Sequence, residues 1–494
     1  MKFRKIEKYT YVEEKHRPYL EELKRFVAES KYLPKYHIYP KCGLMNDPNG
    51  LAYFNGEYNF FYQWFPFEAN HGMKHWGHCT STDLLTWKDK GIALTPDMEY
   101  EKNGCYSGNS IEKDGMLYLF YTANYKADNG KIPKQAVAVM EKDGNIKKYV
   151  NNPIIDGAPS DMSGEIRDPF VFKKNDKYYM FLGAKSKKEK GALLLYTSED
   201  LLNWSYLGEV YLPIDTGYMI ECPGLVEVDG KDVIILSPMG LKKEELKYQN
   251  QFATLYLVGK FDIENMKFDL EYMDEVDNGF DFYAPQAFYG KDNKPMMVSW
   301  FGCGEQTLPS DSEMWKHGLT MTHTLKLVEN KLCNFVSDEL NDLFNDKNEF
   351  NSNKIKTKSN NYHIQFTMGK EDENKWVRFG KENDYWELSF DFDKNIIQVD
   401  RSNLKLPVDI ENGLKRRTDG LNKEDYKVDI YVDNSFVEIF INEGIKSFAI
   451  RCFNLDSNEH DIQFSHVNKG RIDYYNNKTN KFNEKEYNVN VLTH

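Results

Sequence analysis

Apolar and polar positions alternate in short runs over most of the chain, which is the pattern of β-strands half-buried in a sheet. Over the first two thirds, the runs themselves recur. Each recurring run opens on a turn residue and has an apolar residue five positions later; the turn residues are Gly56, Gly115, Asp176, Gly230 and Asn293. Their spacings are 59, 61, 54 and 63 residues. Units of this length that hold several short strands are typical of β-propeller blades, so the sequence predicts five blades.

A second repeat has an independent register. The segment TSTDLLTW over 80–87 returns as TSEDLLNW over 197–204, an offset of 117 residues, or about two units. The alternative is an ordinary β-sandwich whose strands resemble one another by chance. Two registers that agree favour the propeller.

The segments outside the five units have other patterns. Residues 12–30 have apolar positions at helical spacing, and we expect this helix to pack on the side of the propeller. A stretch rich in Asn, Asp and Lys over 340–361 predicts a linker, and the alternation beyond it predicts a second all-β domain, most simply a sandwich. We therefore expect an all-β chain with a short N-terminal helix. The expected parts are a helical extension (1–32), a five-bladed β-propeller (33–335), a linker (336–360) and a C-terminal β-sandwich (361–494).

Composition and charge narrow the possible partners. The chain has 64 basic and 77 acidic side chains and a net charge of −13, which disfavours nucleic acid because that partner needs clustered cations. No apolar run approaches the roughly 18 residues that span a bilayer, and the N-terminus has no apolar stretch like that of a signal peptide. The 7 cysteines are dispersed without a CxxC pair, so neither a disulfide framework nor a zinc site is indicated. We expect a cytoplasmic protein without a membrane partner.

Three acidic residues share one position relative to the repeat. Asp47 in MNDPNG, Asp168 in EIRDPF and Glu221 in IECPGL lie nine, eight and nine residues before the turn residues of their units. Equivalent spacing places them at the same point of three blades, at the entry to the strand before the hairpin. If that strand is innermost, the three side chains meet at one mouth of the central channel.

Converging carboxyl groups suit the cleavage of glycosides. Their repulsion raises the pKa of at least one of them, which provides a proton donor at neutral pH. A second carboxylate can then attack the anomeric carbon or activate water. A lone Asp-Pro is more simply a turn before a strand, but three acids in phase are not explained in that way. Calcium loops need several oxygens in a short segment, which DPNG does not provide, so we expect no metal and no cofactor.

Longer motifs carry a resemblance to a known family. They are MNDPNGL, FFYQWFPF, KHWGH, CYSGNS, EIRDPFVF, IECPGL, NGFDFYAPQ and, in the last third, VDRS and NSFVEIFIN. From about residue 33 onward the chain resembles glycoside hydrolase family 32, and within it the bacterial intracellular branch of sucrose-6-phosphate hydrolases and related β-fructofuranosidases. The resemblance implies a five-bladed propeller followed by a β-sandwich, in agreement with the repeat count.

The resemblance also implies roles for single residues. By it, Asp47 is the nucleophile, Glu221 is the acid/base, and Asp168 holds fructose hydroxyls in the transition state. The residues that match positions binding the fructosyl unit are Asn46, Gln63, Ser107 and Arg167. The weaker matches, which we expect to line the pocket, are Trp76, Tyr106, Asp281 and Trp300.

Neighbours in sequence predict how two of the acids are kept charged. Asn46 precedes Asp47, and Arg167 precedes Asp168. Each can hydrogen-bond the acid beside it, and such bonds favour the ionised form. We therefore expect both aspartates to be carboxylates.

The third acid has different neighbours. Glu221 lies between Ile220 and Cys222, surroundings that favour a protonated carboxyl group. Such a group is what a proton donor needs. Cys222 itself is expected to be a small buried residue without a catalytic role.

The leading hypothesis is a retaining glycoside hydrolase that releases fructose from sucrose 6-phosphate or sucrose through a fructosyl-Asp47 intermediate. One alternative is a fructanase that acts on inulin or levan. Another, in a different class, is a propeller that binds sugars without cleaving them; a nucleophile paired with an acid argues against it. The expected partner is thus a small sugar. Lys74 and Lys316 are candidate phosphate contacts, although a solvated surface lysine is the simpler interpretation of each.

One motif departs from the family. Where the family usually has LTLPREL, this chain has LTMTHTLKL over 319–327. The three acids lie elsewhere, so catalysis is not put in doubt. We expect the change to alter the packing between the last blade and the sandwich, or contacts at the outer edge of the pocket.

Overall fold

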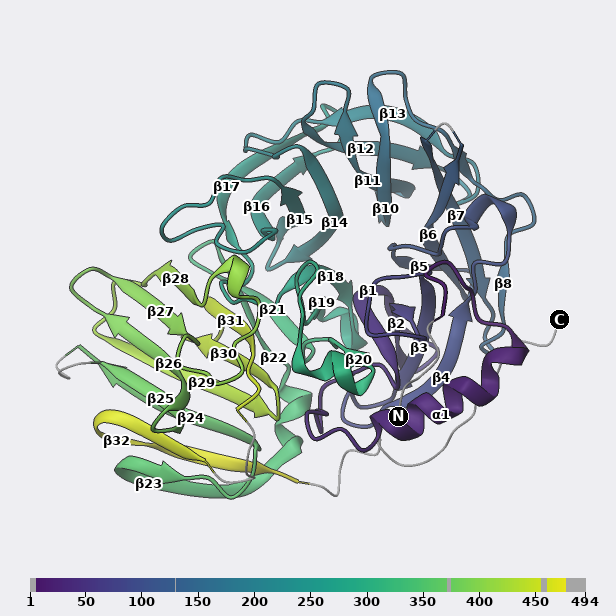
Figure 1. The fold of residues 1–494 in the computed structure, drawn as a ribbon. Helices are drawn as coiled ribbons and strands as arrows, with labels where there is room; N and C mark the ends of the chain where they lie inside the picture. Colours follow the sequence, from purple (N-terminus) through teal and green to yellow (C-terminus); the bar gives the residue numbers. More distant parts are fainter. Residues whose placement is uncertain (1–5, 129, 371–374, 455–459, 477–494) are drawn as a thin grey trace.

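A computed structural model describes residues 6–128, 130–370, 375–454 and 460–476. Five sheets stand around a common centre, and a sixth sheet lies beside this ring (Figure 1). The five-bladed propeller and the C-terminal sandwich predicted from the sequence are therefore confirmed. In the described ranges, no helix is long and apolar enough to cross a membrane.

The blades follow one another along the chain, and the first strand of each lies innermost (Figure 1). The first contains β1 (Gly43–Phe54), β2 (Glu57–Phe65), β3 (His75–Ser81) and β4 (Lys88–Leu94), with the short β20 (Trp315–Lys316) parallel to β1. The second contains β5 (Ser110–Lys113), β6 (Met116–Ala127), β7 (Gly130–Met140), β8 (Ile146–Lys148) and β9 (Ile155–Asp156). The third contains β10 (Met162–Lys174), β11 (Lys177–Ser186), β12 (Gly191–Ser198) and β13 (Ser205–Val210).

The fourth and fifth blades complete the ring. The fourth contains β14 (Met219–Val228), β15 (Lys231–Met239), β16 (Leu255–Asp262) and β17 (Lys267–Glu275). The fifth contains β18 (Tyr283–Tyr289), β19 (Pro295–Trp300), β21 (His323–Val328) and β22 (Lys331–Val336). The short 3-10 helices are η1 (Glu14–His16), η2 (Glu99–Glu101), η3 (Lys291–Asn293), η4 (Pro309–Glu313), η5 (Asp338–Leu343) and η6 (Ile410–Asn412).

The sandwich is a curled sheet that closes over its own apolar core. Along its hydrogen-bonded path lie β28 (Lys415–Asp419), β27 (Ile396–Asp400), β26 (Asp384–Asp391), β25 (Trp376–Lys381), β32 (Asp461–Tyr475), β24 (Asn361–Gly369), β29 (Asp425–Asp433), β30 (Phe436–Ile441) and β31 (Lys446–Arg451). In β26 the burial alternates from residue to residue, as expected of a strand with one solvated face.

Part of the segment predicted as a linker is a strand. β23 (Phe344–Lys356) pairs antiparallel with β32. It lies at an edge, and most of its side chains are exposed or partly exposed. Its sequence is therefore rich in Asn, Asp and Lys and lacks the apolar alternation of a half-buried strand. The prediction of a linker over 336–360 is wrong for this stretch.

The helix α1 (Arg17–Val27) packs on the propeller by one apolar stripe, as predicted. Leu20, Leu23 and Val27 are buried in the same cluster as residues of the first blade. The ring of Tyr19 lies 6.4 Å from that of Phe67, which follows β2. The helix therefore covers the outer part of the first blade (Figure 1).

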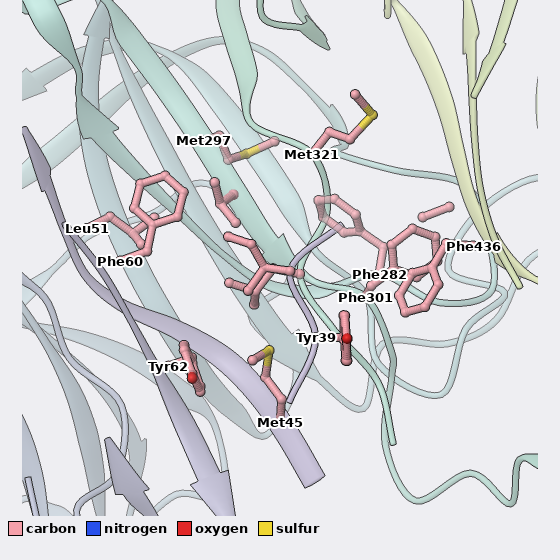
Figure 2. Packing of buried hydrophobic residues seen from close by; sticks show 14 of the residues in the cluster. Tyr39, Met45, Leu51, Phe60, Tyr62, Phe282, Met297, Phe301, Met321 and Phe436 are labelled. Atoms are coloured by element: carbon pink, nitrogen blue, oxygen red, sulfur yellow. The ribbon is translucent and has the colours of Figure 1, made fainter. Parts of the chain in front are cut away.

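One buried cluster joins the first blade, the fifth blade and the sandwich. Phe60 of β2, Met297 of β19 and Phe436 of β30 belong to it (Figure 2). Burial of side chains of this size contributes about 1.5–3 kcal/mol each. The sandwich cannot separate from the propeller without exposing this cluster to water.

Polar side chains cross the same junction. Asp433 of β29 accepts the main-chain N–H groups of Tyr36 and His37 at 2.8 and 2.9 Å. The His37 ring lies between two carboxylates, with Nδ1 at 2.8 Å from Asp433 and Nε2 at 2.8 Å from Glu438. A doubly protonated imidazolium can donate to both. Burial opposes this charge, but the hydrogen bonds to Asp433 and Glu438 outweigh it and raise the pKa of His37 to about 9.

The segment that departs from the family meets the same carboxylate. His323 Nε2 lies 2.7 Å from Glu438 Oε2, and the Met321 N–H group donates to Oε1 at 2.8 Å. The substituted motif therefore contacts the sandwich, which is the first of the two places expected for its effect.

We expect His37→Ala to lower the free energy of unfolding by about 3–5 kcal/mol, because two buried carboxylates lose their shared cation. The pKa of His37 is about 9 in the folded protein, whereas the ordinary value of 6.5 applies to the unfolded chain. Its contribution to stability is thus complete below about pH 6.5 and is lost as the pH rises to about 9. The difference between wild type and variant, measured by urea unfolding, should shrink over that range.

His466→Ala is the matched control. It removes a half-buried histidine that is hydrogen-bonded to Ser465 and lies far along β32 from the junction. It should lower the free energy of unfolding at pH 6.5 by less than His37→Ala does. A difference for His37→Ala that stays constant between pH 6.5 and 9 contradicts the assignment.

Candidate active site

A proline marks a bulge at an equivalent point of four innermost strands. The prolines are Pro48 in β1, Pro169 in β10, Pro223 in β14 and Pro285 in β18, and the pairing with the next strand shifts around each. Proline fits there because it has no N–H group to offer the ladder. In three blades the preceding residue has a positive φ: Asp168 (62°), Cys222 (47°) and Ala284 (50°). Bulges re-aim side chains, and in the third and fourth blades they turn both residues before the proline toward neighbouring blades.

The bulges correct the predicted register of the acids. Asp47 and Asp168 each precede a proline directly, but in the fourth blade Cys222 holds that position. Glu221 lies one residue earlier and is equivalent to Arg167. The three acids still meet, because Asp47 and Asp168 both face the Cys222 thiol and Glu221 bonds Arg167, which precedes Asp168.

Asp47 is surrounded by donors. Asn46 Nδ2 donates to Oδ1 at 3.0 Å, as predicted, and Gln63 Nε2 donates to Oδ2 at 3.2 Å. Ser107 of the second blade donates its hydroxyl to the same oxygen. Burial raises the pKa of Asp47, while the bonds from Ser107 and Asn46 act in the opposite direction. The structure thus brings the predicted nucleophile together with three of its predicted neighbours.

Asp168 is almost fully buried. The Cys222 N–H group donates to its Oδ2 at 2.9 Å, and the Asp168 N–H group donates to Thr122 Oγ1 at 2.8 Å. Burial, followed by the charge of Glu221, raises the pKa of Asp168 to about 7. Its surroundings therefore act against the ionised form that the sequence predicts for Asp168.

Both oxygens of Glu221 have donors. Arg167 donates to Oε1 from Nε at 2.9 Å and from Nη2 at 2.7 Å, and the Tyr283 hydroxyl donates to Oε2 at 2.7 Å. The prediction that Arg167 bonds Asp168 is wrong, because the bulge turns the guanidinium toward the fourth blade. Nor do the sequence neighbours of Glu221 define its surroundings, since Ile220 points into an apolar cluster.

Sequence reasoning missed two residues of the site. The Cys222 thiol lies 3.8 Å from Asp47 Oδ2 and 3.6 Å from Asp168 Oδ2, so it is more than a buried filler. Burial raises its pKa well above the usual range, and the protonated thiol donates to the two acids. Tyr283 could have been found, because it precedes Ala-Pro in its blade as Glu221 precedes Cys-Pro.

Lys74 lies behind the nucleophile. Its Nζ donates to Asn46 Oδ1 at 2.6 Å and lies 3.1 Å from His71 Nδ1. Lys74 is buried, and burial lowers its pKa to about 7. It therefore supports the Asn46–Asp47 pair and is not the solvated lysine that the sequence suggested.

Trp76 and Tyr106 lie at different depths in the propeller. Trp76 is fully buried between the first and second blades, so the expectation that it lines the pocket is wrong. Its Nε1 donates to the Tyr106 carbonyl oxygen at 3.0 Å. Tyr106 itself is partly exposed next to Ser107, and burial raises its pKa to about 12. Trp76 thus supports the loop that carries Ser107.

Asp281 belongs to the junction with the sandwich. It is fully buried, and its Oδ2 accepts Arg401 Nη1 at 3.1 Å and the Arg451 N–H group at 2.7 Å. The expectation that it lines the pocket is therefore wrong. It lies two residues before Tyr283, at a point where the chain still faces the sandwich.

Trp300 does reach the neighbourhood of the acids. Its ring lies 6.2 Å from that of Tyr283 and 6.0 Å from that of His71. It therefore stands between the Glu221 side of the site and the loop after β2. In the described part of the chain, no group of three or more His, Cys, Asp or Glu side chains is arranged to hold a metal ion.

Comparisons with known proteins agree with this geometry. Residues 37–335 match the N-terminal domain of glycosyl hydrolases family 32, and residues 335–483 match the C-terminal domain of that family. A sucrose-6-phosphate hydrolase from Streptococcus mutans is 36% identical over 88% of this chain and 91% of that protein. One from Staphylococcus xylosus is 33% identical over 93% of this chain and 95% of that protein.

Solved structures show the same architecture over nearly the whole chain. A sucrose-6-phosphate hydrolase from Lactobacillus gasseri is 32% identical, with a TM-score of 0.90, and the match covers 95% of this chain and 98% of that one. A Bombyx mori β-fructofuranosidase in complex with sucrose is 28% identical, with a TM-score of 0.82 over 93% and 97% of the two chains. The chain belongs to glycoside hydrolase family 32.

Proposed function

We propose that the protein is a retaining β-fructofuranosidase that releases fructose from sucrose 6-phosphate and also acts on sucrose. The observation that carries the proposal is the meeting of Asp47, Asp168 and Glu221 from three blades around Cys222. Such a set provides a nucleophile, a proton donor and a group to hold the sugar. The names of relatives above 30% identity support the phosphorylated substrate.

In the first step, Asp47 attacks C2 of the fructosyl unit. The C2–oxygen bond to the leaving sugar breaks, and Glu221 gives its proton to that oxygen. A covalent fructosyl-Asp47 ester remains. Asn46 donates to one oxygen of Asp47 and Ser107 to the other, so the carboxylate is kept in one orientation.

In the second step, Glu221 takes a proton from water, and the water oxygen attacks C2. The bond from C2 to Asp47 breaks, so fructose leaves with its original anomeric configuration. Asp168 accepts hydrogen bonds from fructose hydroxyls in both steps, and these strengthen as charge develops on the ring. Arg167 and Tyr283 keep the Glu221 carboxyl group in one orientation through the cycle.

The alternatives left open by the sequence have less support. A fructanase would act through the same three acids, so the acids do not distinguish it; the relatives' names favour the disaccharide. A sugar-binding propeller without catalysis would have no need for an acid held by two donors beside a nucleophile. Release of fructose from sucrose 6-phosphate, sucrose and inulin by the purified protein tests all three.

We expect Asp47→Asn and Glu221→Gln each to abolish most turnover. An amide cannot form the covalent ester, and loss of the proton donor costs about 10²- to 10⁴-fold when the leaving group needs protonation. A leaving group that departs without protonation should partly rescue Glu221→Gln but not Asp47→Asn. Single-turnover kinetics of fructose release measure both effects.

Glu227→Gln is the matched control, because Glu227 is an exposed acid on the same strand β14. It should keep wild-type turnover. Near wild-type kcat in either active-site variant, with the fold confirmed by circular dichroism, would show that the acid in question has no chemical role.

The raised pKa of Asp168 predicts a pH dependence. Its pKa is about 7, and the protonated form has lost the negative charge that strengthens hydrogen bonds from fructose hydroxyls. We therefore expect kcat/KM to fall as the pH decreases below about 7, with the apparent value belonging to the coupled acids. Asp168→Asn should lose about 10²- to 10³-fold in kcat/KM and also this acid limb. A wild-type kcat/KM that is flat from pH 5 to 8 contradicts the assignment.

A further inference from the structure

A pocket of about 420 Å³ lies where the N-terminal arm over residues 6–12 meets the first and fifth blades. Its charged and titratable lining residues are Lys8, Glu68, His71, Glu305 and Lys316. The volume is within the range of sites that hold small ligands. This pocket has no role in the two steps of the proposed mechanism.

Two chains of contacts connect the pocket with the reacting groups. On one side, His71 lies 3.1 Å from Lys74, which bonds Asn46, and Asn46 bonds Asp47. On the other side, the His71 ring lies 6.0 Å from Trp300, Trp300 lies 6.2 Å from Tyr283, and Tyr283 bonds Glu221. His71 therefore links the pocket to Asp47 through Lys74 and Asn46, and to Glu221 through Trp300 and Tyr283.

The N-terminal arm is held in place by main-chain hydrogen bonds. The Ile6 N–H group donates to Glu68 at 3.3 Å, and the Met73 N–H group donates to the Lys8 carbonyl oxygen at 2.8 Å. Further along, the Val12 N–H group donates to His75 Nε2 at 2.9 Å. These bonds fix the backbone of Lys8 at the pocket while its side chain stays exposed.

We propose that this pocket receives the leaving sugar and that Lys8 binds the phosphate group of that sugar. The inference rests on the proposed function and assigns the part of the site that recognises a phosphomonoester. It makes the N-terminal arm a part of the substrate site.

The charges around the pocket favour Lys8 among its cations. Lys316 already pairs with Asp311 at 2.8 Å and donates to the Gln306 carbonyl oxygen, so it is less suited to the contact that the sequence suggested for it. Lys8 has no ion-pair partner among the described residues. An ammonium group without a partner can bind a phosphate without breaking an existing pair.

Three lysines act on His71 in the lining of this pocket. Glu68 accepts the N–H group of Ile6, and Glu305 is exposed at the rim. At His71, burial and then the charges of Lys74, Lys316 and Lys8 all hold the pKa well below its usual range. Burial acts against any charge, but the three lysines act against a cation alone, and their charges attract a phosphate group.

The test compares phosphorylated and free sugars in the intact protein. We expect Lys8→Ala to lower the ratio of kcat/KM for sucrose 6-phosphate to kcat/KM for sucrose by about tenfold or more, because a charge-assisted hydrogen bond is lost. Lys8→Glu should lower the ratio further, and Lys8→Arg should keep most of it. In the same variants, glucose 6-phosphate should inhibit sucrose hydrolysis about tenfold more weakly, while inhibition by glucose should stay as it is in the wild type.

Lys15→Ala is the matched control, because it removes the same charge from an exposed lysine of the N-terminal region that pairs with Glu13. It should keep the wild-type ratio. An unchanged ratio in Lys8→Ala, or an equal loss on both sugars, overturns the assignment of Lys8 and leaves the proposed function intact. A wild-type protein that releases fructose from neither sugar overturns both.

Discussion

Three carboxyl groups that meet from three blades repel one another, and the residues around them reduce that repulsion. The Arg167 guanidinium pairs with the Glu221 carboxylate. The Cys222 thiol and N–H group donate hydrogen bonds to the aspartates. Burial, followed by the remaining repulsion, raises the pKa values of Asp47 and Asp168 above their usual range. A site with this charge balance can hold one proton near neutral pH and move it, which the cleavage of a glycoside requires.

The same constraint requires the innermost strands to keep their positions relative to one another. Side chains from different blades must stay within hydrogen-bond distance, so the innermost strands cannot shift against one another. The sandwich contributes to this through Asp281, which bonds Arg401 and lies two residues before Tyr283, the residue that bonds Glu221. The junction at His37 ties the start of the propeller to the same sandwich. The second domain thus stabilises the strand that positions the acid/base.

The spacing of turn residues predicted five blades because each blade repeats one order of strands and hairpins, which leaves a period in the sequence. The acids were found in the same way. Side-chain direction could not be read in this manner, since a bulge of one residue decides whether Arg167 meets Asp168 or Glu221. Burial of Trp76 depends on the neighbouring blade, and the strand Phe344–Lys356 is formed by pairing with the distant β32, which local composition does not reveal.

The central claim is that Asp47 forms a covalent bond with the fructosyl unit, and the stereochemistry of transfer tests it most directly. When sucrose is cleaved in the presence of methanol, a fructosyl-Asp47 intermediate is attacked by methanol on the face opposite Asp47. Two displacements retain the configuration, so the account predicts methyl β-fructofuranoside as the transfer product. A methyl fructoside that is the α-anomer alone would contradict it, because one direct displacement inverts the centre.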